Sequence, residues 1–99
     1  MGAQISSPPK KFGSWLSRTS GTIYRADTDG FVTAYKNAVA GNNLKGETEA
    51  ATPPTVVRTW QQGVGAGEIG ISFPVRKADY WRVTGVGGEV VFWIPLETA

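Results

Sequence analysis

The sequence contains neither cysteine nor histidine among its 99 residues. Without cysteine the chain forms no disulfide, carries out no thiol chemistry and lacks the usual ligand of structural zinc sites. Without histidine it also lacks the common proton shuttle of enzymes and the commonest metal ligand. Most enzyme mechanisms lose their central residue here, so we expect a non-enzymatic protein that uses no cofactor and no metal.

Long apolar runs and concentrated charge are lacking as well. The longest apolar run, Val90 to Leu96, is far shorter than the roughly 20 residues that a membrane helix needs. The N-terminal residues show no apolar core of the signal-peptide type. Ten Lys and Arg against eight Asp and Glu leave a formal charge of +2, and these charges are scattered, whereas nucleic-acid binders concentrate theirs. We therefore expect no signal peptide, no membrane insertion and no nucleic-acid partner.

The residues that are abundant favour β-structure. Val and Thr occur ten times each and Ile five times, against three Leu and one Met. Branched side chains suit the pleated surface of a sheet better than a helix. A single domain of this length buries only about two-thirds of its unfolded surface, so its core is modest and a partner chain would help to stabilise it.

The first 20 residues differ from the rest. Pro8 and Pro9 enforce extended geometry, and Lys10 and Lys11 keep the segment solvated. The spacing of apolar residues within 12–18 suits one or two turns of helix. We expect residues 1–20 to form an extended N-terminal arm with a short helical turn, outside the compact domain.

Residues 21–99 show short β-type runs separated by turn residues. About seven to eight short strands at spacings of roughly 8–12 residues are typical of an antiparallel β-sandwich or jelly roll. The all-β domain is therefore expected to span residues 21–99, with strands at 21–25, 31–36, 44–48, 55–60, 68–73, 80–84 and 89–96.

Alternation divides the residues of each expected strand between its two sides. In the second strand it separates Phe31 and Tyr35 from Val32 and Ala34. The last strand is apolar on both sides, which predicts either a central place in the sandwich or a cover from another chain. It is expected to form a final hairpin with the strand at 80–84.

Two pairs of carboxylates are candidates for a metal site or a catalytic site. Asp27 and Asp29 before Gly30 resemble the opening of a calcium loop, but the later ligands are lacking, and a β-turn is favoured. Glu47 and Glu49 have the spacing of an acid and base pair, but they lie in a polar stretch without the apolar wall that such a pair needs. We interpret them as surface charges.

Four tryptophans remain to be explained. Trp15, Trp81 and Trp93 are expected to pack, whereas Trp60 ends a strand beside two glutamines. Packing and binding are equally favoured for Trp60, because exposed aromatic side chains are common platforms for sugars and proteins.

Several stretches follow one family pattern. An Asp29-Gly30 turn leads into Phe-Val-Thr-Ala-Tyr at 31–35, and the chain closes on Phe-Trp-Ile-Pro-Leu at 92–96. Together with the rest of 21–35, with 53–58 and with 71–85, these residues resemble the small C-terminal tip domains of tailed-phage fibres and related prophage proteins. The resemblance covers about residues 21–96 and contains no catalytic signature. Ala78 stands where the pattern has glycine.

The resemblance implies a trimeric, tumour-necrosis-factor-like jelly roll. On that basis the chain is expected to be a fibre tip, knob or decoration of a virion, made in the host cytoplasm. It would be a homotrimer, attached to a larger virion or fibre component through residues 1–20, and would contact a glycan or protein receptor on the host surface. The residues expected to pack in the trimer are Phe31, Tyr35, Phe73, Trp81, Phe92 and Trp93.

A second interpretation belongs to another class. A monomeric carbohydrate-binding module would use exposed Trp60 and Tyr24 as sugar platforms. The two interpretations differ in oligomeric state, which sedimentation measures directly.

Overall fold

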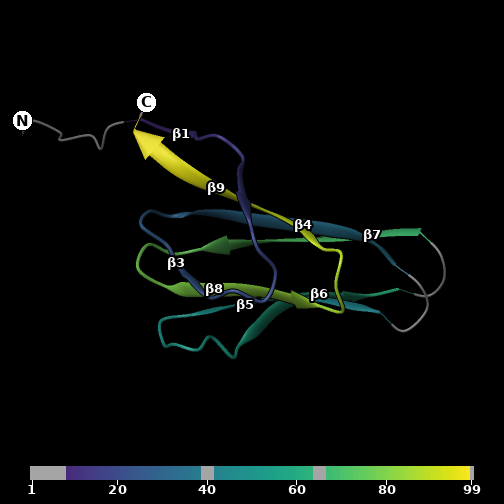
Figure 1. Cartoon of the computed structure of the whole chain (residues 1–99). Helices are drawn as coiled ribbons and strands as arrows, with labels where there is room; N and C mark the ends of the chain where they lie inside the picture. The colour runs from purple at the N-terminus through teal and green to yellow at the C-terminus, as the bar shows by residue number, and fades with distance from the viewer. Residues whose placement is uncertain (1–8, 39–41, 64–66, 99) are drawn as a thin grey trace, which may run out of the picture.

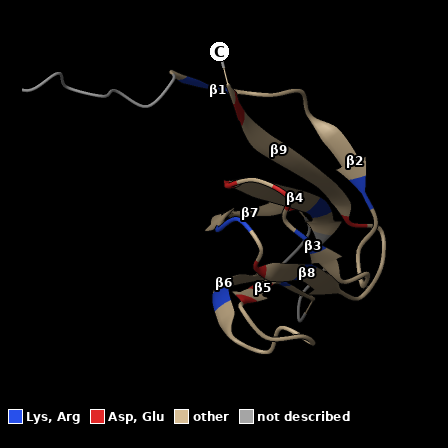
Figure 2. Ribbon diagram, turned by 90° about the vertical axis from the view of Figure 1, so that its left-hand side faces the viewer, with Lys and Arg blue, Asp and Glu red and all other residues tan. Residues whose placement is uncertain are grey.

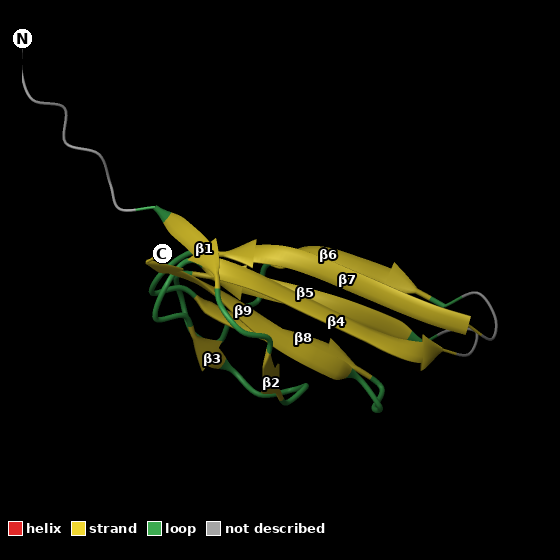
Figure 3. Ribbon diagram, turned by 90° about the horizontal axis from the view of Figure 1, so that it is seen from above, coloured by secondary structure: helices red, strands yellow, loops and turns green. Residues whose placement is uncertain are grey.

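The computed structural model describes residues 9–38, 42–63 and 67–98, and the regular structure in these ranges is entirely β-strand (Figures 1 and 3). The all-β prediction is therefore confirmed. The strands are β1 (Lys10–Phe12), β2 (Leu16–Arg18), β3 (Tyr24–Arg25), β4 (Gly30–Ala38), β5 (Asn43–Glu49), β6 (Val57–Gln62), β7 (Gly67–Val75), β8 (Tyr80–Gly85) and β9 (Val90–Thr98).

The strands form two antiparallel sheets that lie face to face (Figure 1). Sheet I has the order β1-β9-β4-β7, with β2 also paired to β9, and sheet II has the order β3-β8-β5-β6. The pairing is nested along the chain: β1 and β2 pair with β9, β3 with β8, β4 with β7, and β5 with β6. A long hairpin rolled up in this way is a jelly roll, as the strand spacing predicted.

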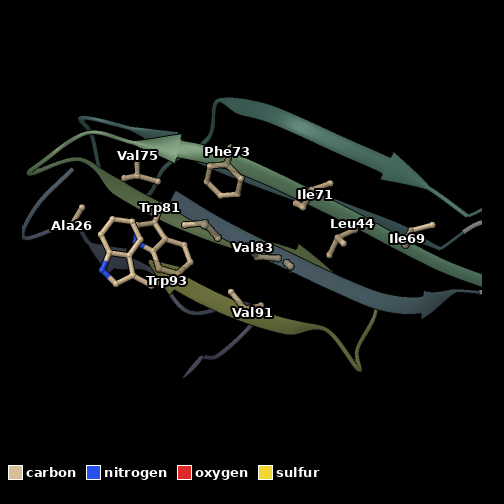
Figure 4. Packing of buried hydrophobic residues seen from close by; sticks show 12 residues of the cluster. Ala26, Leu44, Ile69, Ile71, Phe73, Val75, Trp81, Val83, Val91 and Trp93 are labelled. Carbon is tan, nitrogen blue, oxygen red and sulfur yellow. The ribbon is translucent and has the colours of Figure 1, made fainter. Parts of the chain in front are cut away.

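The core lies between the two sheets, where alternate residues of β4, β7, β8 and β9 meet together with Leu44 of β5 (Figure 4). In β7 the burial alternates strictly from Ile69 to Val75. Trp81 of sheet II stacks on Trp93 of sheet I with ring centroids 5.9 Å apart, so the largest core side chains join the sheets. The buried apolar residues are Ala26, Val32, Ala34, Leu44, Ile69, Ile71, Phe73, Val75, Trp81, Val83, Val91 and Trp93.

The prediction of a hairpin between the last two strands is wrong. β8 and β9 lie in different sheets, and the segment between them crosses from one layer to the other. Each strand has one fully apolar side, and placing the strands in opposite sheets lets Trp81 and Trp93 bury these sides against each other. Gly87 and Gly88, both at positive φ (112° and 77°), provide the backbone conformation of this crossing.

The N-terminal segment also differs from the expectation. In place of a helical turn, residues 10–12 and 16–18 form two strands along β9, and the N–H of Gly13 donates to the carbonyl of Pro95 over 2.7 Å. Pairing with β9 satisfies backbone groups that an isolated turn would leave to water. The segment is extended, but it belongs to sheet I from residue 10 onward. Residues 1–8 lie outside the described ranges.

Candidate functional surfaces

The outer side of sheet I carries a group of exposed apolar side chains. Their positions follow from alternation: in β4 and β9 the residues between the core positions point outward. Phe12 and Trp15 are 63% and 64% exposed, which is unusual for aromatic side chains. We call this surface the apolar face, and it consists of the exposed residues Phe12, Trp15, Phe31, Tyr35 and Val90 and the half-buried residues Phe92, Ile94 and Leu96.

Two aromatic pairs hold the N-terminal segment on this face. Phe12 meets Phe31 edge to face at 5.7 Å between ring centroids, and Trp15 meets Phe92 in the same way at 5.8 Å. These pairs cover part of β4 and β9, yet their own outer sides stay open to solvent. The last strand, apolar on both sides, is thus packed on its inner side and only partly covered on its outer side.

The apolar face carries no charge along its two central strands. The outward positions of β4 are Phe31, Thr33, Tyr35 and Asn37, and those of β9 from Val90 to Leu96 are all apolar. The charged residue of β9, Glu97, lies near the C-terminal end of the strand, where Figure 2 shows the colour of an acidic residue. Another copy of the same surface would therefore meet it without like-charge repulsion.

The six residues expected to pack in a trimer divide into two groups. Phe31, Tyr35 and Phe92 belong to the apolar face. Phe73, Trp81 and Trp93 are 3%, 1% and 7% exposed and lie in the core of the single chain, so they cannot contact another subunit. The prediction is wrong for these three, because it did not separate the inner and outer sides of the sheets.

Tyr24 is not an open sugar platform, and this expectation is corrected. One side of its ring stacks on Trp81 at 4.8 Å, and the guanidinium of Arg18 lies 5.6 Å from the ring centroid. Its hydroxyl accepts a hydrogen bond from the backbone N–H of Thr19. Burial alone would raise the pKa of Tyr24, but hydrogen bonds from Thr19 and Thr22 hold it below the usual value. The ring is part of the packing at the edge of sheet II.

Trp60 is exposed, at 58%, on the outer side of sheet II. It lies opposite Lys45 on the neighbouring strand, and Asn43 lies opposite Gln62. Together with Val57 these residues line a shallow groove of about 430 Å³, which we call the Trp60 groove. Of the two interpretations of Trp60, packing within the chain is wrong. Trp15, for which packing was favoured, is likewise exposed.

Three of the four carboxylates that were candidates for chemistry have structural partners. Asp29 accepts a hydrogen bond from the backbone N–H of Lys77 over 2.7 Å, and Glu49 accepts one from that of Val56 over 2.8 Å. Glu47 is not a surface charge: it is buried in β5 and pairs with Arg82 at 3.3 Å. In residues 9–38, 42–63 and 67–98, His, Cys, Asp and Glu form no cluster of three suited to a metal ion.

The sequence reasoning missed a buried ion pair. The ammonium of Lys36 lies 3.1 Å from the carboxylate of Glu89, and the two side chains are 3% and 2% exposed. Ser20 donates a hydrogen bond to the same carboxylate over 2.7 Å, and Lys36 also donates to the carbonyl of Gly87. Burial alone would raise the pKa of Glu89, but the bonds from Ser20 and Lys36 hold it below its ordinary value. The sequence pattern does indicate the burial of Lys36, because alternation from Val32 and Ala34 places it on the same side of the strand as these two residues.

Comparisons with protein-family models, with curated proteins and with solved structures give no match to this chain. Over the described ranges, no helix has the length and apolar character to cross a membrane.

Proposed function

We propose that this chain is a non-enzymatic structural and attachment protein of a phage particle, a fibre tip, knob or decoration that forms a homotrimer and contacts a ligand on the host surface. Residues 1–20 would attach it to a larger virion or fibre component. The observation that carries the proposal is the uncharged, exposed apolar face of sheet I. The sequence resemblance over residues 21–96 supplies the virion context and the three-fold symmetry.

The size of the exposed apolar area supports self-association. From aromatic side chains of about 150–250 Å² each, the exposed parts of Phe12, Trp15, Phe31, Tyr35 and Val90 amount to roughly 500 Å². This is near the upper end for monomeric proteins, whose largest apolar patches cover about 300–600 Å². Burying it at about 25 cal/mol per Å² gives on the order of 10 kcal/mol per subunit before association entropy is subtracted.

Sedimentation velocity at micromolar concentration tests the proposal. We expect a species of three 10.6 kDa chains, and we expect Phe31→Glu with Tyr35→Glu to reduce it to one chain, because the substitutions place carboxylates in the centre of the apolar face. Val86→Glu is the matched control. Val86 is 67% exposed but lies between β8 and β9, outside the apolar face, so this variant stays trimeric. A monomeric or dimeric wild-type protein would contradict the proposal.

The second candidate function is a monomeric carbohydrate-binding module. The exposed ring of Trp60 above the Trp60 groove favours it, although Tyr24 no longer contributes a platform. A wild-type protein that sediments as a monomer and binds a sugar would select this candidate.

A further inference from the structure

The Trp60 groove has the composition of a small ligand site. We propose that it binds an acidic saccharide, with a pyranose ring against the indole of Trp60, ring hydroxyls on the carboxamides of Asn43 and Gln62, and a carboxylate at the ammonium of Lys45. The proposal names the ligand class of the host-surface contact and, in that respect, rests on the proposed function.

The indole provides the stacking surface. Trp60 is 58% exposed, and nothing in the aromatic pairs of the described residues engages its ring, whereas Trp15, Trp81 and Trp93 each contact another aromatic side chain. The C–H face of a pyranose is apolar and flat, so it covers such a ring and leaves its hydroxyls at the periphery. An exposed tryptophan thereby recovers the burial that it lacks in the free chain.

Side chains that can form hydrogen bonds with sugar hydroxyls lie around the indole. Asn43 and Gln62 are cross-strand partners two positions along from the Lys45 and Trp60 pair, so both carboxamides lie on the same side of the sheet as the indole. Each carboxamide both donates and accepts. The Oδ1 of Asn43 is buried with no hydrogen-bond partner in the described part of the chain, and turning the carboxamide toward the groove would let a ligand hydroxyl satisfy it.

The charge of the groove selects an acidic ligand. Among the described residues that line the groove, Lys45 is the one that carries a charge. The ion pairs of the described residues are Lys36 with Glu89 and Arg82 with Glu47, so Lys45 has no carboxylate within ion-pair distance there. Glu47, the nearest acidic residue along β5, is already neutralised by Arg82. A carboxylate on the sugar would therefore meet an uncompensated ammonium group.

Self-association and saccharide binding would use different faces of the sandwich, so they are compatible. The apolar face lies on the outer side of sheet I, and the Trp60 groove lies on the outer side of sheet II. Association of subunits through the former leaves the latter open. Three grooves on one particle would then bind a multivalent glycan surface with avidity, even when each groove binds weakly.

The test is a glycan array of neutral, uronic-acid-containing and sialylated oligosaccharides, probed with the full chain. We expect binding to the carboxylated glycans, a loss of at least about tenfold in Trp60→Ala, and a loss of about tenfold in Lys45→Met that is confined to these glycans. Lys45→Met retains the apolar stem, so it removes the charge with little change in packing. Val86→Ala, an exposed substitution outside the groove, is the control and leaves binding unchanged.

Several outcomes would overturn the inference: no glycan bound by the folded wild-type chain, binding unchanged in Trp60→Ala, or binding restricted to neutral glycans. Should Trp60→Ala fail to fold, Lys45→Met and Gln62→Ala test the same groove. Sedimentation of the same samples separates the two proposals. A trimer that binds no acidic glycan overturns this inference alone, whereas a monomer that binds one overturns the proposed assembly alone.

Discussion

At the scale of single residues, Ala78 has a backbone conformation that alanine rarely adopts. Its φ is 74°, in the left-handed region where a Cβ costs about 1–2 kcal/mol. The conformation is held by the turn between β7 and β8, in which the N–H of Ala78 donates to the carbonyl of Ala26 over 2.8 Å and that of Asp79 to the carbonyl of Arg76 over 3.0 Å. Glycine would adopt this conformation without that cost.

Replacing Ala78 with glycine is expected to stabilise the protein. Relief of the strain exceeds the additional entropy that glycine gives the unfolded chain, for a net gain of about 0.5–1 kcal/mol. Thermal unfolding measures this as a rise of several degrees in Tm. Ala50→Gly is the matched control: Ala50 is exposed and has no positive φ, so this variant is destabilised. An unchanged or lower Tm in Ala78→Gly would contradict the argument.

Side-chain contacts on this scale were only partly predictable. Alternation correctly placed Val32 and Ala34 on one side of the strand and Phe31 and Tyr35 on the other, because the period of a strand is a local property. The cover over Tyr24 comes from Arg18 and Trp81, two residues that are distant from each other in the chain. No local pattern shows that such residues meet.

At the scale of elements, the ion pair of Lys36 and Glu89 connects three segments of the chain that are distant in sequence. Lys36 lies in β4, Glu89 lies directly before β9, and Ser20 lies between β2 and β3. The pair thus fixes the crossing between β8 and β9 against sheet I. Removing one partner leaves the other charge buried and uncompensated, which typically costs about 3–5 kcal/mol.

We expect Lys36→Met to reduce the free energy of unfolding by about 3 kcal/mol at pH 7, and we expect this difference to narrow under acid. In the wild type the pKa of Glu89 lies below its ordinary 4.5, so its contribution to stability is complete above 4.5 and is lost as pH falls through the lowered pKa. In the variant the carboxylate is buried without its cation, and protonation relieves that cost.

Urea unfolding at pH 7 and at pH 4 measures both effects. The double variant Lys36→Met with Glu89→Gln is the control, since it removes both charges and should recover part of the stability at pH 7. A difference between Lys36→Met and wild type that stays constant with pH would contradict the role of Glu89.

The position of most elements followed from the sequence, but their partners did not. The seven strands expected from 21 onward coincide with β3 to β9 to within a few residues at each end, because alternation and turn residues act locally. β8 and β9 pair with strands that are far away in the chain, and β1 and β2 pair with β9. These pairings depend on which apolar sides of the strands pack against each other in the core. Gly13 and the spacing of Phe12, Trp15 and Leu16 gave no indication of these partners.

At the scale of the whole molecule, the two outer surfaces differ in charge. Sheet I presents the apolar face, whereas sheet II combines charged residues such as Lys45, Glu49 and Arg82 with the exposed ring of Trp60. The sequence predicted a small core that would benefit from another chain, but it could not say which surface such a chain would cover. That distinction required the assignment of each strand to a sheet.

Stability is therefore expected to depend on protein concentration. If folded subunits associate through the apolar face, mass action raises Tm as concentration increases. The wild type should melt at higher temperature across about a hundredfold increase in concentration, whereas Phe31→Glu with Tyr35→Glu should melt at a constant temperature. A wild-type Tm independent of concentration would contradict self-association. Calorimetry at several concentrations provides the measurement.

The nested pairing of strands has a consequence for the order of events during synthesis. The innermost pair joins positions as near as Glu47 and Val57, whereas the outermost joins Lys10 to Thr98. β9 is translated after β1, β2 and β4, the strands that it joins. Sheet II can assemble its long strands first, but the outer side of sheet I exists only when β9 has entered. Nascent chains on one polysome thus lack the completed apolar face until each has folded.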